Sequence, residues 1–152
     1  MRNGRFAVVF LDSNIWGYAL IVQDPRKRAI AQRIISQAVR EDGFAISTQV
    51  ISECANVLFN KGKKDPQEII GCINYMNQLE LVVQVTTLIA RRAVEIKALY
   101  GLQFYDAQIV AAAESVGCTE LWSEDMGDGQ NYCGVRCINP FQEGATADHP
   151  NF

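Results

Sequence analysis

Four carboxylates in this chain are spaced so that a fold could bring them to one point. Asp12 and Asp125 each follow a short apolar segment typical of a buried strand, whereas Glu53 and Asp106 lie near the starts of amphipathic helices. Carboxylates held close together repel one another strongly unless protons or cations intervene. Because oxygen ligands without His or Cys suit hard divalent ions, we expect a Mg²⁺ or Mn²⁺ site.

The two acids at strand ends also have simpler interpretations. Asp12 could itself be the N-cap of the next helix, or Ser13 or Asn14 could cap that helix and leave Asp12 free to face outward. Asp125 lies in a loop where Asp is common for conformational reasons alone. That loop, 124–129, hints at calcium binding, but its spacing does not fit an EF-hand.

The two helical acids differ in how much they indicate. Glu53 alone would be an ordinary surface glutamate at the edge of an apolar stripe. Asp106 lies in line with Ile109, Val110 and Ala113, at the middle of an apolar helix face, where an unpaired carboxylate is costly. The alternative is an Asp that compensates the helix dipole and bends toward solvent. Asp106 is therefore the most informative of the four acids.

The elements that must position these residues alternate between strand and helix. We expect strands over 6–11, 44–47, 81–85, 119–123 and 135–139, and helices over 15–22, 25–41, 49–60, 66–79, 87–100 and 104–116. This alternation predicts an α/β fold with a parallel sheet covered on both faces. If the strand order reverses between the first and fourth strands, all four acids surround one crevice. We expect one domain, 1–141, and a flexible tail, 142–152.

Composition narrows the class of protein. The 152 residues are 49% hydrophobic and 20% charged, and the net charge of −3 argues against a broad basic surface for nucleic acid. No apolar run is long enough to span a membrane, so we expect a cytoplasmic protein. The five cysteines suggest buried free thiols. Cys133 and Cys137 could suggest zinc, but the chain has neither a second Cys pair nor any His besides His149.

Four short segments together resemble the PIN-domain ribonucleases, and most of all the VapC-type toxins of prokaryotic toxin–antitoxin pairs. The segments are Leu11-Asp12-Ser13-Asn14, Ser52-Glu53-Cys54-Ala55-Asn56-Val57-Leu58, Tyr105-Asp106-Ala107-Gln108-Ile109-Val110-Ala111-Ala112-Ala113 and Ser123-Glu124-Asp125-Met126. Each segment is weak alone, but the ordered set spans residues 6–140 with the family's spacing. The resemblance implies a three-layer α/β/α fold whose parallel five-stranded sheet has the order 3-2-1-4-5.

The same resemblance implies a homodimer that cleaves RNA with Mg²⁺ or Mn²⁺ and is inhibited by a cognate antitoxin. It assigns the catalytic carboxylates to Asp12, Glu53, Asp106 and Asp125. It places Asn14 and Ser123 among the substrate-binding residues. Asp128 is an additional carboxylate near the fourth position and a second candidate for that metal ligand, although the spacing favours Asp125.

The residues leave three functions open. The first is phosphodiester hydrolysis at the metal site, with RNA held by basic residues and stacked on aromatic ones. The second is a binding module whose acidic pocket captures a basic partner segment with little or no catalysis. The third is phosphotransfer through Asp12, which Asn14 disfavours because that chemistry usually has a second Asp there. The basic candidates are Arg26, Lys27, Arg28, Lys61, Lys63 and Lys64, and the aromatic ones are Trp16 and Tyr105, for which core packing is the alternative.

Overall fold

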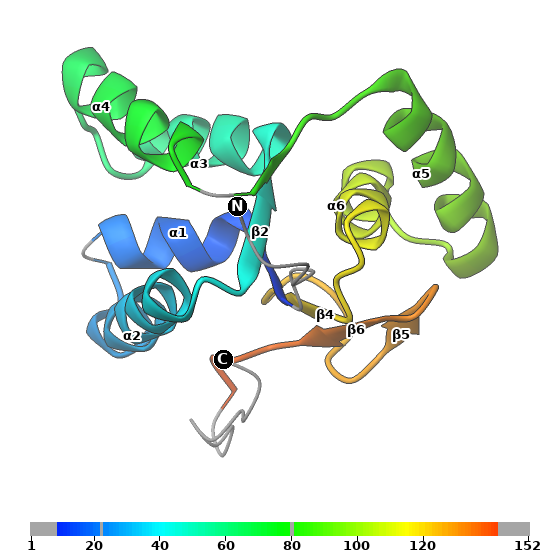
Figure 1. Cartoon of the computed structure of the whole chain (residues 1–152). Helices are drawn as coiled ribbons and strands as arrows, with labels where there is room; N and C mark the ends of the chain where they lie inside the picture. The colour runs from blue at the N-terminus through cyan, green and yellow to red at the C-terminus, as the bar shows by residue number, and fades with distance from the viewer. Residues whose placement is uncertain (1–8, 22, 80, 143–152) are drawn as a thin grey trace.

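The computed structural model describes residues 9–21, 23–79 and 81–142. These residues form six strands and six helices that alternate along most of the chain (Figure 1). The strands are β1 (Val9–Leu11), β2 (Phe44–Ser47), β3 (Val82–Val83), β4 (Glu120–Trp122), β5 (Asn131–Tyr132) and β6 (Val135–Ile138). The helices are α1 (Ser13–Leu20), α2 (Pro25–Glu41), α3 (Thr48–Asn60), α4 (Pro66–Asn77), α5 (Thr87–Tyr100) and α6 (Phe104–Ser115).

Local sequence explains where most helices begin. Asp24, Ser47, Asp65 and Thr86 are the N-caps of α2, α3, α4 and α5, and each side chain accepts a hydrogen bond from a backbone N–H of the first turn. Helix α5 ends at Gly101, whose φ of 71° glycine adopts more readily than a residue with a Cβ. The short polar signals between the apolar segments therefore fix the boundaries that place the acidic residues.

The central sheet has the strand order β3-β2-β1-β4-β6-β5. All neighbouring strands are parallel except β5 and β6, and β1 is paired so that Phe10 lies opposite Ala45 on β2 and Leu121 on β4. From β1, the next strands β2 and β3 are added toward one edge of the sheet. The chain then returns to the centre at β4, and β6 and β5 lie toward the other edge. This reversal confirms the expected order for the five parallel strands and opens a crevice at the carboxyl ends of β1 and β4.

The sequence-based prediction was wrong in omitting an edge strand. Residues Asn131–Tyr132 form β5, which turns back through Cys133 and Gly134 and pairs antiparallel with β6. Both turn residues have positive φ, 52° and 86°, as a tight two-residue hairpin requires. A cysteine rarely marks such a turn, and a strand of two residues has too little alternation to be recognised.

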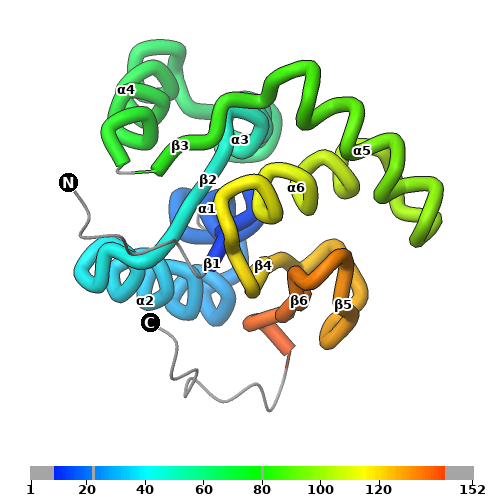
Figure 2. Tube along the Cα trace, turned by 45° about the vertical axis from the view of Figure 1, so that its right-hand side comes forward, coloured from blue at the N-terminus to red at the C-terminus, as the bar shows by residue number. Residues whose placement is uncertain are grey.

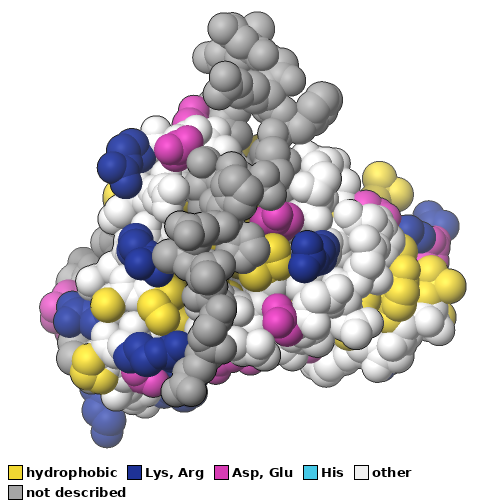
Figure 3. Space-filling model, turned by 90° about the horizontal axis from the view of Figure 1, so that it is seen from below, with side chains coloured by type: hydrophobic (Ala, Val, Ile, Leu, Met, Phe, Trp, Pro, Cys, Tyr) yellow, Lys and Arg dark blue, Asp and Glu magenta, His cyan; other side chains and the backbone are white. Residues whose placement is uncertain are grey.

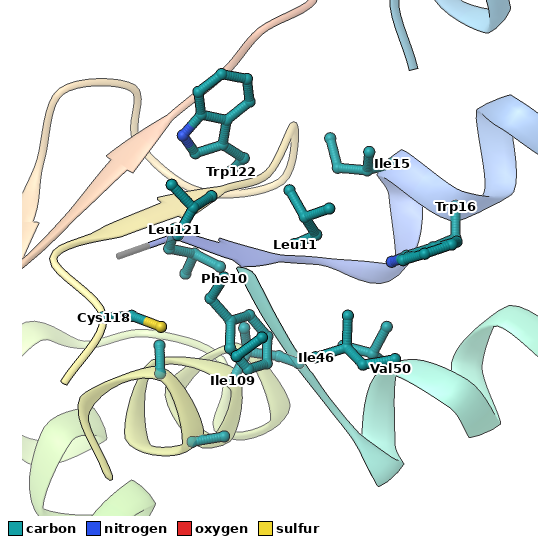
Figure 4. Packing of buried hydrophobic residues seen from close by; sticks show 14 of the residues in the cluster. Phe10, Leu11, Ile15, Trp16, Ile46, Val50, Ile109, Cys118, Leu121 and Trp122 are labelled. Atoms are coloured by element: carbon teal, nitrogen blue, oxygen red, sulfur yellow. The ribbon is translucent and has the colours of Figure 1, made fainter. Parts of the chain in front are cut away.

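Side chains alternate between the two faces of the sheet. Figure 4 shows Phe10 directed toward Ile109 of α6, whereas the next residue, Leu11, points to the opposite face with Ile15 of α1. Phe10, Leu11, Ile15 and Ile109 are at most 1% exposed. Helices α5 and α6 lie side by side on the first face (Figure 2). The layered core thereby fixes α1 and α6, which carry residues of the candidate site.

Other sequence-based expectations concern the surface and the termini. Among the described helices, none combines the length and apolar character needed to cross a membrane. Basic and acidic side chains are interspersed on the coloured part of the face seen in Figure 3. The five cysteines are free thiols, and Cys54, Cys118 and Cys137 are buried. All but the first residue of the expected tail, 142–152, lies outside the described residues, as do residues 6–8 of the first expected strand.

Candidate active site

Asp12 lies in the crevice between the carboxyl ends of β1 and β4. Its side chain is only 3% exposed. Oδ1 accepts a hydrogen bond from the Ser13 backbone N–H at 2.7 Å, and Oδ2 accepts one from the Ser123 hydroxyl at 2.8 Å. Asp12 is thus the N-cap of α1, which confirms one of the two alternatives that the sequence left open and excludes a cap at Ser13 or Asn14. Strand β1 ends at Leu11 and α1 begins at Ser13, so Asp12 alone lies between them.

The hydroxyl of Ser123 connects three residues of the site. It donates to Asp12 Oδ2 and accepts from Asn14 Nδ2 at 3.2 Å and from the Asp125 backbone N–H at 3.1 Å. One donor and two acceptor positions are all that a serine hydroxyl offers, so Ser123 is fully used. Its side chain is completely buried. In this arrangement Ser123 positions the carboxylates and is not accessible to a substrate.

Asn14 fixes the loop that carries the fourth carboxylate. Its Nδ2 also donates to Asp125 Oδ2 at 3.2 Å, and its Oδ1 accepts from the Glu124 backbone N–H at 3.2 Å. Both ends of one amide side chain therefore hold the residues after β4 against the start of α1. Asp125 itself is exposed, as a group that must meet a ligand from solution needs to be.

Glu53 is held by two neutral donors from different helices. Its Oε2 accepts from the Ser13 hydroxyl at 2.8 Å, and its Oε1 accepts from Gln49 Nε2 at 2.6 Å. The same Gln49 amide donates to the Tyr105 carbonyl at 3.0 Å and accepts from Gln108 Nε2 at 2.8 Å. Gln49 thereby links Glu53 on α3 to the first turns of α6, the helix that carries Asp106.

Burial and the charges of neighbouring carboxylates raise the pKa values of Asp12 and Asp106. Burial, followed by the charges of Glu53 and Asp125, raises the pKa of Asp12 from 3.8 to about 7, although its two hydrogen bonds oppose this rise. Burial and the charges of Asp125 and Glu53 also raise the pKa of the half-buried Asp106. Within the described part of the chain, no Lys or Arg forms an ion pair with these four acids, so the site concentrates negative charge.

Asp128 has a different role from the four acids above. It is exposed, and its Oδ1 accepts a hydrogen bond from the Asn139 backbone N–H at 2.8 Å, just after β6. This contact fastens the loop after β4 to the end of β6. Asp128 is therefore held at the end of β6, whereas Asp125 is held by Asn14 at the start of α1.

The donor chemistry of the site fits a hard divalent cation. Asp12, Glu53, Asp106 and Asp125 supply only oxygen ligands, and a cation would offset the mutual repulsion that, after burial, contributes to the raised pKa of Asp12 and Asp106. Burial, with the charges of Asp12 and Asp128 next in size, raises the pKa of the nearby Cys137 thiol to about 12, which keeps it protonated. Among the described residues, no three His, Cys, Asp or Glu side chains form a ready-made metal-binding group.

A groove of about 410 Å³ extends from this site between α1 and α3. Its lining includes Glu53 and Asp125 at the acidic end, with Gly17 and Val57 farther along. The lining also includes Tyr18 and Glu124, whose hydroxyl and carboxylate are joined at 2.6 Å. The acidic centre thus opens into a space large enough for a ligand.

Lys27 is used to fasten the wall of the groove. Its ammonium donates to Glu124 Oε2 at 2.8 Å and to the Tyr18 hydroxyl at 3.2 Å, and it lies 4.8 Å from the centre of the Tyr18 ring. The half-buried pair with Glu124 also raises the pKa of Lys27. Lys27 therefore stabilises the residue next to Asp125.

The remaining basic and aromatic candidates differ in their exposure and in whether they line the groove. Trp16 is 3% exposed and packs near Phe44, so the alternative of core packing was correct for it. Tyr105 is 58% exposed and stays available to a ligand. Arg26 donates to the Phe141 carbonyl at 2.9 Å, and only Lys61 among the basic candidates lines the groove.

Sequence reasoning missed the neutral residues that hold the acids. Ser13 was considered only as a cap, and Gln49 and Gln108 were not considered as site residues. Gln49 precedes Glu53 by four residues, so both were expected on the same helix face, and this spacing could have identified it. The contact between Gln49 and Gln108 joins residues 59 positions apart, and no local pattern indicates it.

Comparison with known proteins points to one family. Residues 9–127 match the family model described as PIN domain. A sequence comparison with curated proteins finds no match.

Several solved structures share the fold. VapC20 of Mycobacterium tuberculosis, described as a Sarcin-Ricin loop cleaving toxin, has a TM-score of 0.62 and 19% identity, with 84% of this chain and 98% of that chain covered. A chain of a toxin–antitoxin complex from Klebsiella pneumoniae has a TM-score of 0.59 and 21% identity, covering 87% and 97%. A chain of DNA-bound VapBC from Salmonella typhimurium has a TM-score of 0.62 and 16% identity, covering 86% and 96%. At these identities the likeness extends to the fold alone.

The raised pKa of Asp12 has a consequence for stability without metal. The folded protein binds a proton at Asp12 more tightly than the unfolded chain does, so this residue makes stability fall as pH rises from about 4 through about 7. We expect Asp12→Asn to match the wild type near pH 4 and to exceed it at pH 8 by a few kcal/mol. Urea unfolding in EDTA at both pH values measures this difference.

Asp128→Asn, the same charge change at an exposed position, is the control for net charge. A stability change for Asp12→Asn that does not vary with pH would contradict the electrostatic interpretation.

Proposed function

The chain belongs to the PIN domain family, and from this premise we propose that it is an endoribonuclease that hydrolyses RNA phosphodiester bonds with a divalent metal ion. The proposal is supported by the electrostatic coupling of Asp12 and Asp106 to Glu53 and Asp125, whose charges add to the effect of burial in raising the pKa of Asp12 and Asp106. Four intact acids favour an enzyme over a binding module, which would have no need to retain all of them.

In the proposal, Asp12, Asp106 and Asp125 hold Mg²⁺ or Mn²⁺, and Glu53 completes the acidic centre. A bound divalent ion would lower the pKa of a water and screen the charge of the phosphate. Ser123 and Asn14 keep Asp12 and Asp125 in place, whereas Ser13 and Gln49 orient Glu53. We choose Asp125 over Asp128 as the fourth acid because, in addition to burial, the charge of Asp125 raises the pKa of both Asp12 and Asp106, whereas Asp128 is held at the end of β6.

The proposal includes partners. The structures with the same fold include chains from toxin–antitoxin complexes, which supports a role as the toxin of such a pair, acting on RNA in the cytoplasm.

Helix α5 exposes Leu88 and Leu99, which are 71% and 67% exposed and would be available for a homodimer interface. We expect expression of the wild-type chain alone to arrest growth, and Asp106→Asn to relieve the arrest. Equal arrest by both chains would contradict a toxic nuclease activity, and light scattering of the harmless variant tests the dimer.

RNA cleavage is the direct test of the proposed reaction. A mixed panel of structured and unpaired RNAs is incubated with purified wild type or Asp106→Asn, in Mn²⁺, Mg²⁺ or EDTA. We expect metal-dependent cleavage by the wild type and a loss of at least a hundredfold in the variant, because the substitution keeps the shape and removes a ligand charge. Equal cleavage by both proteins would indicate a contaminant, and binding of a basic peptide without cleavage would favour the binding module.

The contacts of Gln49 generate a further expectation. Gln49→Met removes the donor to Glu53 and the link to α6, so we expect about tenfold more Mn²⁺ to be needed for half-maximal thermal stabilisation. Activity at saturating Mn²⁺ should largely recover, because the ligands themselves remain. Gln67→Met, an exposed glutamine on α4, is the matched control. An unchanged Mn²⁺ midpoint would show that Gln49 does not position the metal centre.

A further inference from the structure

The groove beside the acidic centre is formed by two helices that run alongside each other in step. Ser13 on α1 contacts Glu53 on α3 at 2.8 Å. One turn farther along, a Cβ on Gly17 would lie 3.6 Å from Val57. These positions and the next pair, Ile21 and Lys61, all line the groove. Ile21, the C-cap of α1, lies eight positions after Ser13, so the groove is about 12 Å long.

The two ends of the groove differ in how their polar groups are used. At the acidic end, Asn14 and Glu53 are engaged in hydrogen bonds through both of their polar atoms. Farther along, the Lys61 ammonium, the Gln23 amide and Asn56 Nδ2 form no hydrogen bond or ion pair with any other described residue. These donors are exposed, so a ligand in the groove would find them available.

The charges along the groove favour a phosphodiester strand. A divalent ion at the acidic end would place a cation beside Glu53 and Asp125, and from there the groove passes the uncharged Gly17 and Val57 to the ammonium of Lys61. An RNA strand has the complementary pattern, because a phosphate lies on each side of every nucleoside. A basic peptide attracted by the carboxylates would instead meet Lys61 at the other end.

We propose that this groove is a subsite for the unpaired nucleotide next to the scissile bond, with Lys61 at its distal phosphate and Asn56 and Gln23 at its base. The subsite rests on the proposed ribonuclease function and adds contacts to the RNA strand outside the acidic centre. A base in an RNA helix is stacked and paired, so only a base from a loop or single strand can enter a space between two protein helices. The side-chain amides offer donors and acceptors that can distinguish one base from another.

Lys61→Gln tests the phosphate contact, with Lys64→Gln as a control of equal charge outside the groove. We expect Lys61→Gln to raise KM about fivefold to tenfold at low salt, with kcat unchanged. The slope of log KM against log salt should decrease by about 0.7, the value for one phosphate contact on a single strand. An equal change in both variants, or in neither, would overturn the proposed contact.

Asn56→Ala tests the base contact, with Asn74→Ala on α4 as the control. RNA lacking the base on either side of the cleaved bond is compared with intact RNA. We expect the missing base at one flank to lower wild-type kcat/KM by about tenfold or more, and Asn56→Ala to reduce this penalty. Identical penalties in wild type and Asn56→Ala would overturn the base contact.

Binding of a labelled phosphorothioate RNA, which resists hydrolysis, separates this inference from the proposed function. Binding that depends on Lys61 without any cleavage of normal RNA would support the subsite and refute the nuclease. Cleavage that is the same in wild type, Lys61→Gln and Asn56→Ala would refute the subsite and support the nuclease. If these variants instead release a co-expressed partner protein while RNA binding is unchanged, the groove is a protein-docking site and the proposal fails.

Discussion

The constraint that organises the site is the negative charge gathered where the strand order of the sheet reverses. Asp12 is almost completely buried there, and burial together with neighbouring carboxylates raises its pKa to about 7. A fold selected for stability alone would place an apolar or paired residue at this position. The core on both sides of β1 supplies the stability that tolerates this arrangement, and a cation would relieve the repulsion.

The residues that hold the acids are neutral. Ser13, Asn14, Gln49 and Ser123 orient the carboxylates by hydrogen bonds and leave their charge intact, whereas an Arg or Lys in the same places would neutralise it. Lys27, which is nearby, pairs with Glu124 instead. In the groove, the carboxylates of Glu53 and Asp125 at one end are likewise separated from the ammonium of Lys61 at the other. Neutral positioning groups thus preserve the negative charge that would attract the proposed metal ion.

The sequence was informative where the signal is local. Ser47, Asp65 and Gly101 mark helix ends through their own backbone contacts, and the apolar phase of α6 identified Asp106 as unusual. The sequence was uninformative where contacts join distant segments. The link from Gln108 through Gln49 to Glu53, and the use of Asp12 as a cap that also binds Ser123, depend on how helices pack on the sheet. The two-residue strand β5 is defined by its pairing with β6 and has no pattern of its own.

The location of bound metal is the most direct test of the central claim. Crystals grown with Mn²⁺ would be measured for anomalous scattering, in wild type and in Asp106→Asn. We expect a peak among Asp12, Asp106 and Asp125 in the wild type, and a much weaker peak or none in the variant. A peak at Asp128 alone, or no peak in this crevice at millimolar Mn²⁺, would contradict the assignment of these carboxylates to a metal centre.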